Sequence, residues 1–270
     1  MLAKTGVLLV GAYAMMFSIM TGTTFAQETK TAQQAKKADE KMFQPLVQVM
    51  NIRGICEVHN PDVGQYKPAM RNKAYPMGST FRTGIDGRCA LVFSMKDTLR
   101  MSPNSEVVVE ADKANSDVRI VKLIRGQIRT NIRDNPREGA FNVFTEDTFC
   151  KSLSGRGTYT MTRTPTLTIL KVSTVTGSAV VEGPHYTVPA LRAANAIEIQ
   201  TSPNRALSRI ADISGDYNIV LPNGSDKPVT YTMSPKDIVK IWRETAKIGG
   251  RMIVSVLVLK PNGAGWFRSA

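Results

Sequence analysis

Short apolar runs separated by polar turns occupy residues 46–201, and none of them repeats with a helical period. They recur about every eight to twelve residues, a spacing typical of all-β sandwiches, barrels and solenoids. We therefore predict a mainly β fold, built as a twisted solenoid or a sandwich-like stack of short antiparallel strands. The predicted strands lie at residues 46–58, 80–83, 90–93, 99–101, 107–109, 118–128, 141–145, 157–161, 167–175 and 179–181.

The clearest turn signals lie within residues 76–105. A β-favouring run ends at Gly84, and Asp86-Gly87 is a strong hairpin signal because glycine adopts positive φ without a steric cost. The apolar run at residues 90–93 then suits a buried strand. We assign these glycines and Asp86 to turn geometry.

The C-terminal part has a different pattern. Two β-favouring runs, at residues 217–221 and 229–233, predict a hairpin. Ser234 and Pro235 suit the N-cap and the first position of a helix, and residues 252–259 form a nearly continuous apolar strand. We therefore predict a small C-terminal ββαβ unit. Its predicted helix rests on helical spacing of Ile238, Ile241, Trp242, Thr245 and Ile248, with Gly249-Gly250 at its end.

The N-terminus resembles an export signal. A basic start at Lys4 and an apolar stretch lead to Thr24-Phe25-Ala26, a small-x-small ending that predicts cleavage after Ala26. The alternative is an uncleaved membrane anchor, because the apolar stretch approaches the ~20 residues that span a bilayer. We predict a periplasmic or extracellular protein, anchored in the membrane if the signal is retained. The predicted organisation is a signal segment 1–26, a polar linker 27–45, a β domain 46–205 and a C-terminal unit 212–270.

Charge narrows the classes of partner. The chain has 35 Lys and Arg against 22 Asp and Glu, a formal net charge of +13. Such an excess favours encounters with anionic partners. Since the chain is predicted to be exported, we expect an envelope protein or an acidic envelope polymer and no nucleic acid, with membrane contact only if the N-terminal segment is uncleaved.

Three cysteines, Cys56, Cys89 and Cys150, would meet an oxidising compartment. One disulfide with one free thiol and three unpaired buried thiols are both possible. The spacing does not choose between them.

No catalytic or metal-binding motif is found. The two histidines, His59 and His185, have no nucleophile elbow beside them. Cys56-x-x-His59 has no second pair at zinc-site spacing, and Gly155-Arg156-Gly157 has neither a third glycine nor a following helix. We predict a non-enzymatic protein without cofactor or metal. The less favoured alternative is an envelope hydrolase with its site in the loops around His59 or His185.

One basic segment is a candidate binding site. Within it, Lys122, Arg125, Arg129 and Arg133 are predicted to bind an anion or an acidic partner. On a strand, Arg125, Gln127 and Arg129 share one face, with Ile124 and Ile128 on the other. The alternative is a solvated strand face that protects a sheet edge from aggregation.

Four segments, taken in order, resemble the FecR domain, a family named after the periplasmic regulator of ferric-citrate uptake. The resemblance covers about residues 46–201, although the family usually has a glycine where this chain has Ala193-Ala194-Asn195. The segments are residues 77–93, 97–105, 123–128, and 157–161 together with 175–181.

The FecR resemblance implies an exported β-rich interaction module. Since about five residues precede the apolar stretch, we expect no cytoplasmic anti-sigma segment and carry over no sigma-factor control. The predicted function is therefore a non-enzymatic FecR-like binding or sensing module of the bacterial envelope. The alternative is a basic scaffold that binds cell-wall or acidic surface polysaccharide.

Overall fold

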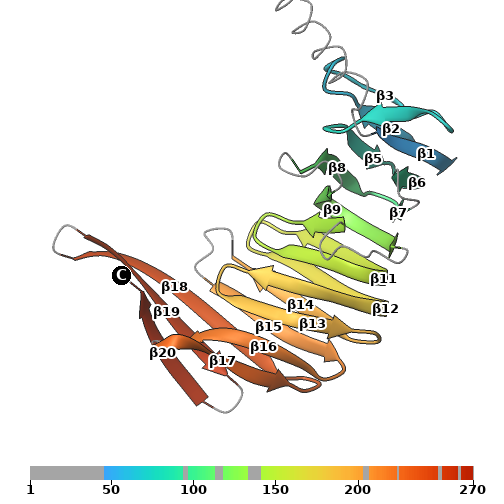
Figure 1. Cartoon of the computed structure of the whole chain (residues 1–270). Helices are drawn as coiled ribbons and strands as arrows, with labels where there is room; N and C mark the ends of the chain where they lie inside the picture. Colours follow the sequence, from blue (N-terminus) through green and yellow to red (C-terminus); the bar gives the residue numbers. More distant parts are fainter. Residues whose placement is uncertain are drawn as a thin grey trace, which may run out of the picture. The chain divides into compact units, whose positions relative to one another are not determined.

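The computed structural model describes residues 46–93, 97–112, 118–132, 141–202, 207–223, 225–248, 251–260 and 263–269. All regular structure in these ranges is β-strand, so the predicted β-rich fold is confirmed (Figure 1). The predicted signal segment and linker lie outside the described ranges. Within them, no helix has the length and apolar character needed to cross a membrane.

Two layers of strands follow from the pairing. Between the described strands, every pair is antiparallel except β9 with β10, which is parallel. The first layer contains, in order of pairing, β4 (Ala74–Pro76), β1 (Leu46–Arg53), β6 (Arg88–Phe93), β7 (Thr98–Met101), β9 (Arg119–Ile132), β11 (Phe149–Arg163), β12 (Thr168–Gly183), β14 (Ala196–Thr201), β15 (Leu207–Ser214), β18 (Ile238–Ile248), β19 (Arg251–Lys260) and β20 (Gly263–Ser269).

The second layer shares three long strands with the first. Strands β9, β11 and β12 pass through both layers, and the two halves of each have different neighbours. The order in this layer is β3 (Tyr66–Pro68), β2 (Cys56–His59), β5 (Thr80–Thr83), β8 (Glu106–Ala111), β9, β10 (Phe141–Phe144), β11, β12, β13 (Tyr186–Arg192), β16 (Tyr217–Asn223) and β17 (Ser225–Met233).

A corner joins the two layers where the shared strands change direction. In β11 and β12 it is formed by Gly155 and Gly177, which pair directly and have φ of 86° and 78°. A Cβ on Gly155 would lie 2.1 Å from the Thr176 carbonyl oxygen, so no side chain fits there. Glycine is therefore required at this corner both by its φ and by the close approach of the two backbones.

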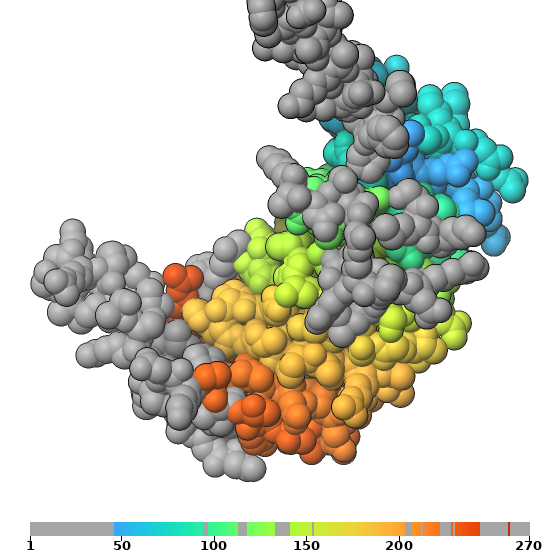
Figure 2. All heavy atoms as spheres, viewed as in Figure 1, coloured from blue at the N-terminus to red at the C-terminus, as the bar shows by residue number. Residues whose placement is uncertain are grey.

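One hydrophobic core fills the space between the layers. Inward positions alternate with outward ones, as in β6, where Cys89, Leu91 and Phe93 are buried. Phe93 packs edge-on against Phe141 of the other layer, with ring centroids 5.3 Å apart. Side chains of neighbouring strands also close the spaces between the ribbons (Figure 2).

The predicted C-terminal helix is wrong, because residues 238–248 form strand β18. Val239 and Ile241 are buried at strand spacing, and the β-branched residues of this segment favour a strand. The expected helix start is instead a turn, in which Asp237 accepts a hydrogen bond from the Ser234 backbone N–H at 3.0 Å. The predicted hairpin does form, from β16 and β17, and the predicted last apolar strand is β19.

All three cysteines are unpaired and buried. The thiols of Cys56 and Cys89 hydrogen-bond to each other, and this bond together with burial raises the pKa of Cys89. Cys150 lies apart from them, and burial raises the pKa of its thiol to about 12. The sequence left open one disulfide with one free thiol or three unpaired buried thiols, and the structure has the three unpaired thiols.

Candidate anion-binding groove

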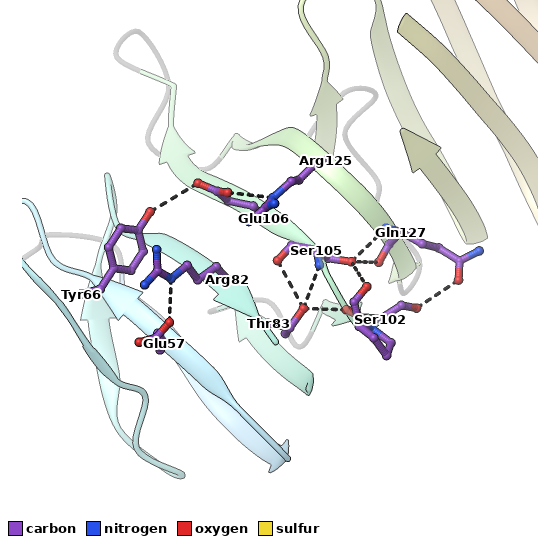
Figure 3. Close-up of polar contacts among 10 residues, drawn as sticks. Glu57, Tyr66, Arg82, Thr83, Ser102, Ser105, Glu106, Arg125 and Gln127 are labelled. Carbon is purple, nitrogen blue, oxygen red and sulfur yellow. Dashed lines mark hydrogen bonds and ion pairs between the residues drawn. The ribbon is translucent and has the colours of Figure 1, made fainter. Parts of the chain in front are cut away.

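Four cationic side chains on the outer face of the second layer, Arg82, Lys122, Arg125 and Lys151, have acidic partners. Arg82 donates to Glu57 at 2.6 Å, and its guanidinium lies 3.7 Å from the centre of the Tyr66 ring (Figure 3). Glu106 accepts from both Tyr66, at 3.4 Å, and Arg125, at 3.1 Å. These alternating charges on neighbouring strands form a compensated surface of the kind expected for a solvated strand face.

The outer face of the first layer is different over β1, β6, β7 and β9, although farther along it Lys171 pairs with Glu198 at 2.9 Å. A hollow of about 670 Å³ opens over β1, β6, β7 and β9. Among the described residues that line it there is neither an aromatic ring nor a carboxylate. We call it the arginine groove, because four of its lining residues are Arg53, Arg88, Arg100 and Arg129.

Strand register places the four arginines in two facing pairs. Arg53 lies opposite Arg88 on β1 and β6, and Arg100 lies opposite Arg129 on β7 and β9. Like charges directly opposite each other in a sheet are destabilising. No described acidic side chain forms an ion pair with any of the four arginines. Two repelling pairs that have no counter-charge in the described part of the chain are difficult to explain by folding alone, and they match a site for anions.

A hydrogen-bonded corner fixes the floor of the groove. Ser102 donates to the Gln127 side-chain oxygen at 3.0 Å, and Gln127 donates to Thr160 at 3.1 Å. Ser105 bonds both the N–H and the C=O of Gln127, at 2.9 and 3.0 Å (Figure 3). Gly126 makes this approach possible, because a Cβ there would lie 2.4 Å from the Ser105 hydroxyl oxygen.

A smaller hollow of about 420 Å³ adjoins the groove beside Arg53 and Arg88. It includes Ile85 and one acid, Asp86. The Asp86 carboxylate accepts the Ile55 backbone N–H at 3.4 Å, so this acid serves the turn geometry that the sequence predicts for it. The only carboxylate described beside either hollow is thus at this end of the groove.

The predicted binding residues separate at the corner. Arg129 lies in the groove, whereas Lys122 and Arg125 lie on the other side of Gly126 and pair with Glu110 and Glu106, at 2.9 and 3.1 Å. A bulge opposite Glu106 and Val107 interrupts the alternation in β9, so that Leu123 rather than Ile124 takes the core position. Arg133 lies outside the described residues.

Three groove residues, Arg53, Arg88 and Arg100, are not among the predicted binding residues. They are far apart in the sequence and come together only through the pairing of β1, β6 and β7. The signal that could have found them is alternation: each is the polar member of a strand whose other face is apolar.

The histidines of the hydrolase alternative lie on elements that do not pair with each other. His59 ends β2, where its ring lies 5.3 Å from that of Tyr66. His185 lies in the turn between β12 and β13, and burial, with a smaller effect of Arg243, lowers its pKa. Neither lines the two hollows described above. In the described ranges, no three His, Cys, Asp or Glu side chains gather as a metal site would require.

Comparisons with known proteins do not assign the chain to a family. No family model matches the chain, and no curated protein does. Two crystal structures, each of a putative anti-sigma factor from Parabacteroides distasonis, are similar at 15% and 14% identity, both with a TM-score of 0.38. Each match covers 58% of this chain and 60% of that chain, less than two thirds of its length. The FecR resemblance therefore stays a prediction from its motifs.

Proposed function

We propose that this chain is a non-enzymatic binding or sensing module of the bacterial envelope, and that it recognises an anionic partner through the arginine groove. One observation carries the proposal: two facing arginine pairs that lack a described carboxylate partner. Residues 1–26 support an exported location, since their pattern is typical of a signal segment.

A specific observation favours the second candidate, a scaffold that binds cell-wall or acidic surface polysaccharide. Asn51, Thr98, Ser102 and Gln127 line the groove beside the arginines. Amide and hydroxyl groups of this kind both donate and accept hydrogen bonds, as sugar hydroxyls do. Cation and neutral polar groups together suit a charged sugar better than a simple inorganic anion.

The proposal predicts that groove arginines, and not basic residues in general, hold the chain to its partner. Arg100→Glu with Arg129→Glu should lower the amount of tagged full-length chain cross-linked in intact envelope about ten-fold or more, because two charge-assisted contacts become repulsive. The measurement is a quantitative cross-linking pull-down at low and high salt, together with fractionation of the tagged chain.

The matched control is Lys122→Glu with Arg125→Glu, which makes the same change in net charge on the compensated face. This control should keep most of the envelope binding. If both double variants bind as the wild type does, at any salt concentration, the groove does not hold the partner and the proposed function is wrong.

A further inference from the structure

The arginine groove has a regular pattern of charge across four strands. A row here is the set of residues that lie side by side across β1, β6, β7 and β9. In one row, Asn51 and Ala90 are followed by the facing pair Arg100 and Arg129. On the neighbouring row, the pair Arg53 and Arg88 precedes Ser102 and Gln127, whose backbones bond at 2.9 Å. Each cationic pair is thus followed or preceded by two neutral residues.

We propose that the groove binds a linear polysaccharide bearing carboxylates, with one carboxylate held by Arg53 and Arg88 and another by Arg100 and Arg129. This inference rests on the proposed function and adds the class of ligand and the way it is held. A guanidinium presents parallel N–H donors that match the two oxygens of a carboxylate, which a lysine ammonium does not do. Every cation among the described lining residues is an arginine.

The distance between the pairs requires two separate anionic groups. Neighbouring strands lie ~4.8 Å apart, so the centre of the β1–β6 pair is about 10 Å from that of the β7–β9 pair across the strands. The pairs are also two residues, about 7 Å, apart along the strands, so their centres are separated by about 12 Å. One carboxylate cannot bridge that distance. An extended chain with repeated carboxylates reaches both pairs at once, and the second contact then forms at a high effective concentration.

The residues between the pairs favour a sugar over the other anionic polymers. A polyphosphate or DNA backbone offers only acceptor oxygens beside its charges, whereas a sugar chain carries hydroxyls beside each carboxylate, and these can pair with the neutral polar groups that separate the cations here. Proteins that hold single-stranded nucleic acid also stack its bases on aromatic rings, and no described residue that lines the groove is aromatic. Ser102 and Gln127 are fixed by the corner and keep free hydrogen-bonding capacity for sugar hydroxyls.

The test uses the full chain and tetragalacturonate, a sugar chain with one carboxylate per unit, as probe. Titration calorimetry at low ionic strength should show binding to tetragalacturonate and none to its carboxyl-reduced, neutral form. Arg53→Gln with Arg88→Gln and Arg100→Gln with Arg129→Gln should each weaken binding about ten-fold or more, because each removes two charge-assisted contacts. Lys122→Gln with Arg125→Gln, the same change in charge on the compensated face, should leave the affinity within about two-fold.

Folding is checked on the same variants. Each groove variant removes a like-charge pair, so its Tm should equal or exceed that of the wild type. A lost affinity with an unchanged Tm then reports on the site itself.

Several results would overturn the inference: equal binding of the neutral sugar, an effect of only one arginine pair, or tighter binding of polyphosphate or of anionic phospholipid vesicles. If tetragalacturonate does not bind while Arg100→Glu with Arg129→Glu still loses envelope binding, the ligand class is wrong and the proposed function stands. If the charge-reversed variant also keeps its envelope binding, both are wrong.

Discussion

All three thiols are buried, but they differ in their neighbours and in their pKa values. Cys150 is fully buried with a pKa of about 12, whereas hydrogen bonding by Cys89 lowers the pKa of Cys56. Since the thiolate is the reactive form, iodoacetamide at pH 8 should label Cys56 before Cys150 in the native protein. Mass spectrometry of timed digests measures the order.

Denatured, reduced chain supplies the control for this labelling, and there all three cysteines should react at similar rates. Early native labelling of Cys150 would contradict the buried position. If the protein is oxidised, the contact between the other two thiols predicts a Cys56–Cys89 disulfide, so that only Cys150 is labelled after denaturation without reductant.

Residue-level chemistry was only partly predictable from the sequence. Arg129 belongs to the predicted basic segment and does line the groove. Arg53, Arg88 and Arg100 needed the pairing of distant strands, and the acids that neutralise Lys122 and Arg125 come from another strand, β8. A run of charge in the sequence reports which residues are basic, but only the register shows which of them keep their charge unopposed.

At the level of elements, the positions of strands and turns were easier to predict from the sequence than the way the strands bend and pack. Alternation and turn residues predicted most strands of residues 46–201, because period two and glycine turns are local signals. The prediction of a C-terminal helix was wrong because the same residues fit both helical spacing and strand propensity, as Ile238, Ile241 and Trp242 do. The bends in β9, β11 and β12 were missed, since a glycine within a strand does not reveal which backbone approaches it.

One corner residue departs from the usual preference for glycine. Ala194, between β13 and β14, has a φ of 66°, which costs an L-residue roughly 1–2 kcal/mol. After the larger unfolded-state entropy of glycine is subtracted, Ala194→Gly should stabilise the fold by about 0.5–1 kcal/mol. Urea unfolding measures this as a higher midpoint with an unchanged slope.

Ala196→Gly is the matched control, because Ala196 begins strand β14 and is not among the residues with positive φ. There glycine should destabilise by about 0.5–1 kcal/mol. If both substitutions lower the midpoint, Ala194 is not strained in the folded protein.

For the whole molecule, His185 links stability to pH. Burial, and then Arg243, lower its pKa in the folded state, whereas the unfolded chain takes up the proton near the ordinary value of about 6.5. The unfolded state therefore binds more protons as pH falls through that value, and the folded state loses stability. His185→Gln should reduce the loss of unfolding free energy between about pH 7.5 and pH 5.5. Equal losses in variant and wild type, measured by urea unfolding at both pH values, would show that His185 is protonated as easily when folded.

The three strands common to both layers have a mechanical consequence. In a sandwich whose layers touch only through side chains, one layer can slide over the other. Here a slip of one residue along β9, β11 or β12 in one layer would move the same backbone by one residue in the other, and turn both sets of inward side chains toward solvent. The shared strands thus fix the register of both layers at once. The spacing of the groove's cations is therefore set by the same backbone that positions the core side chains.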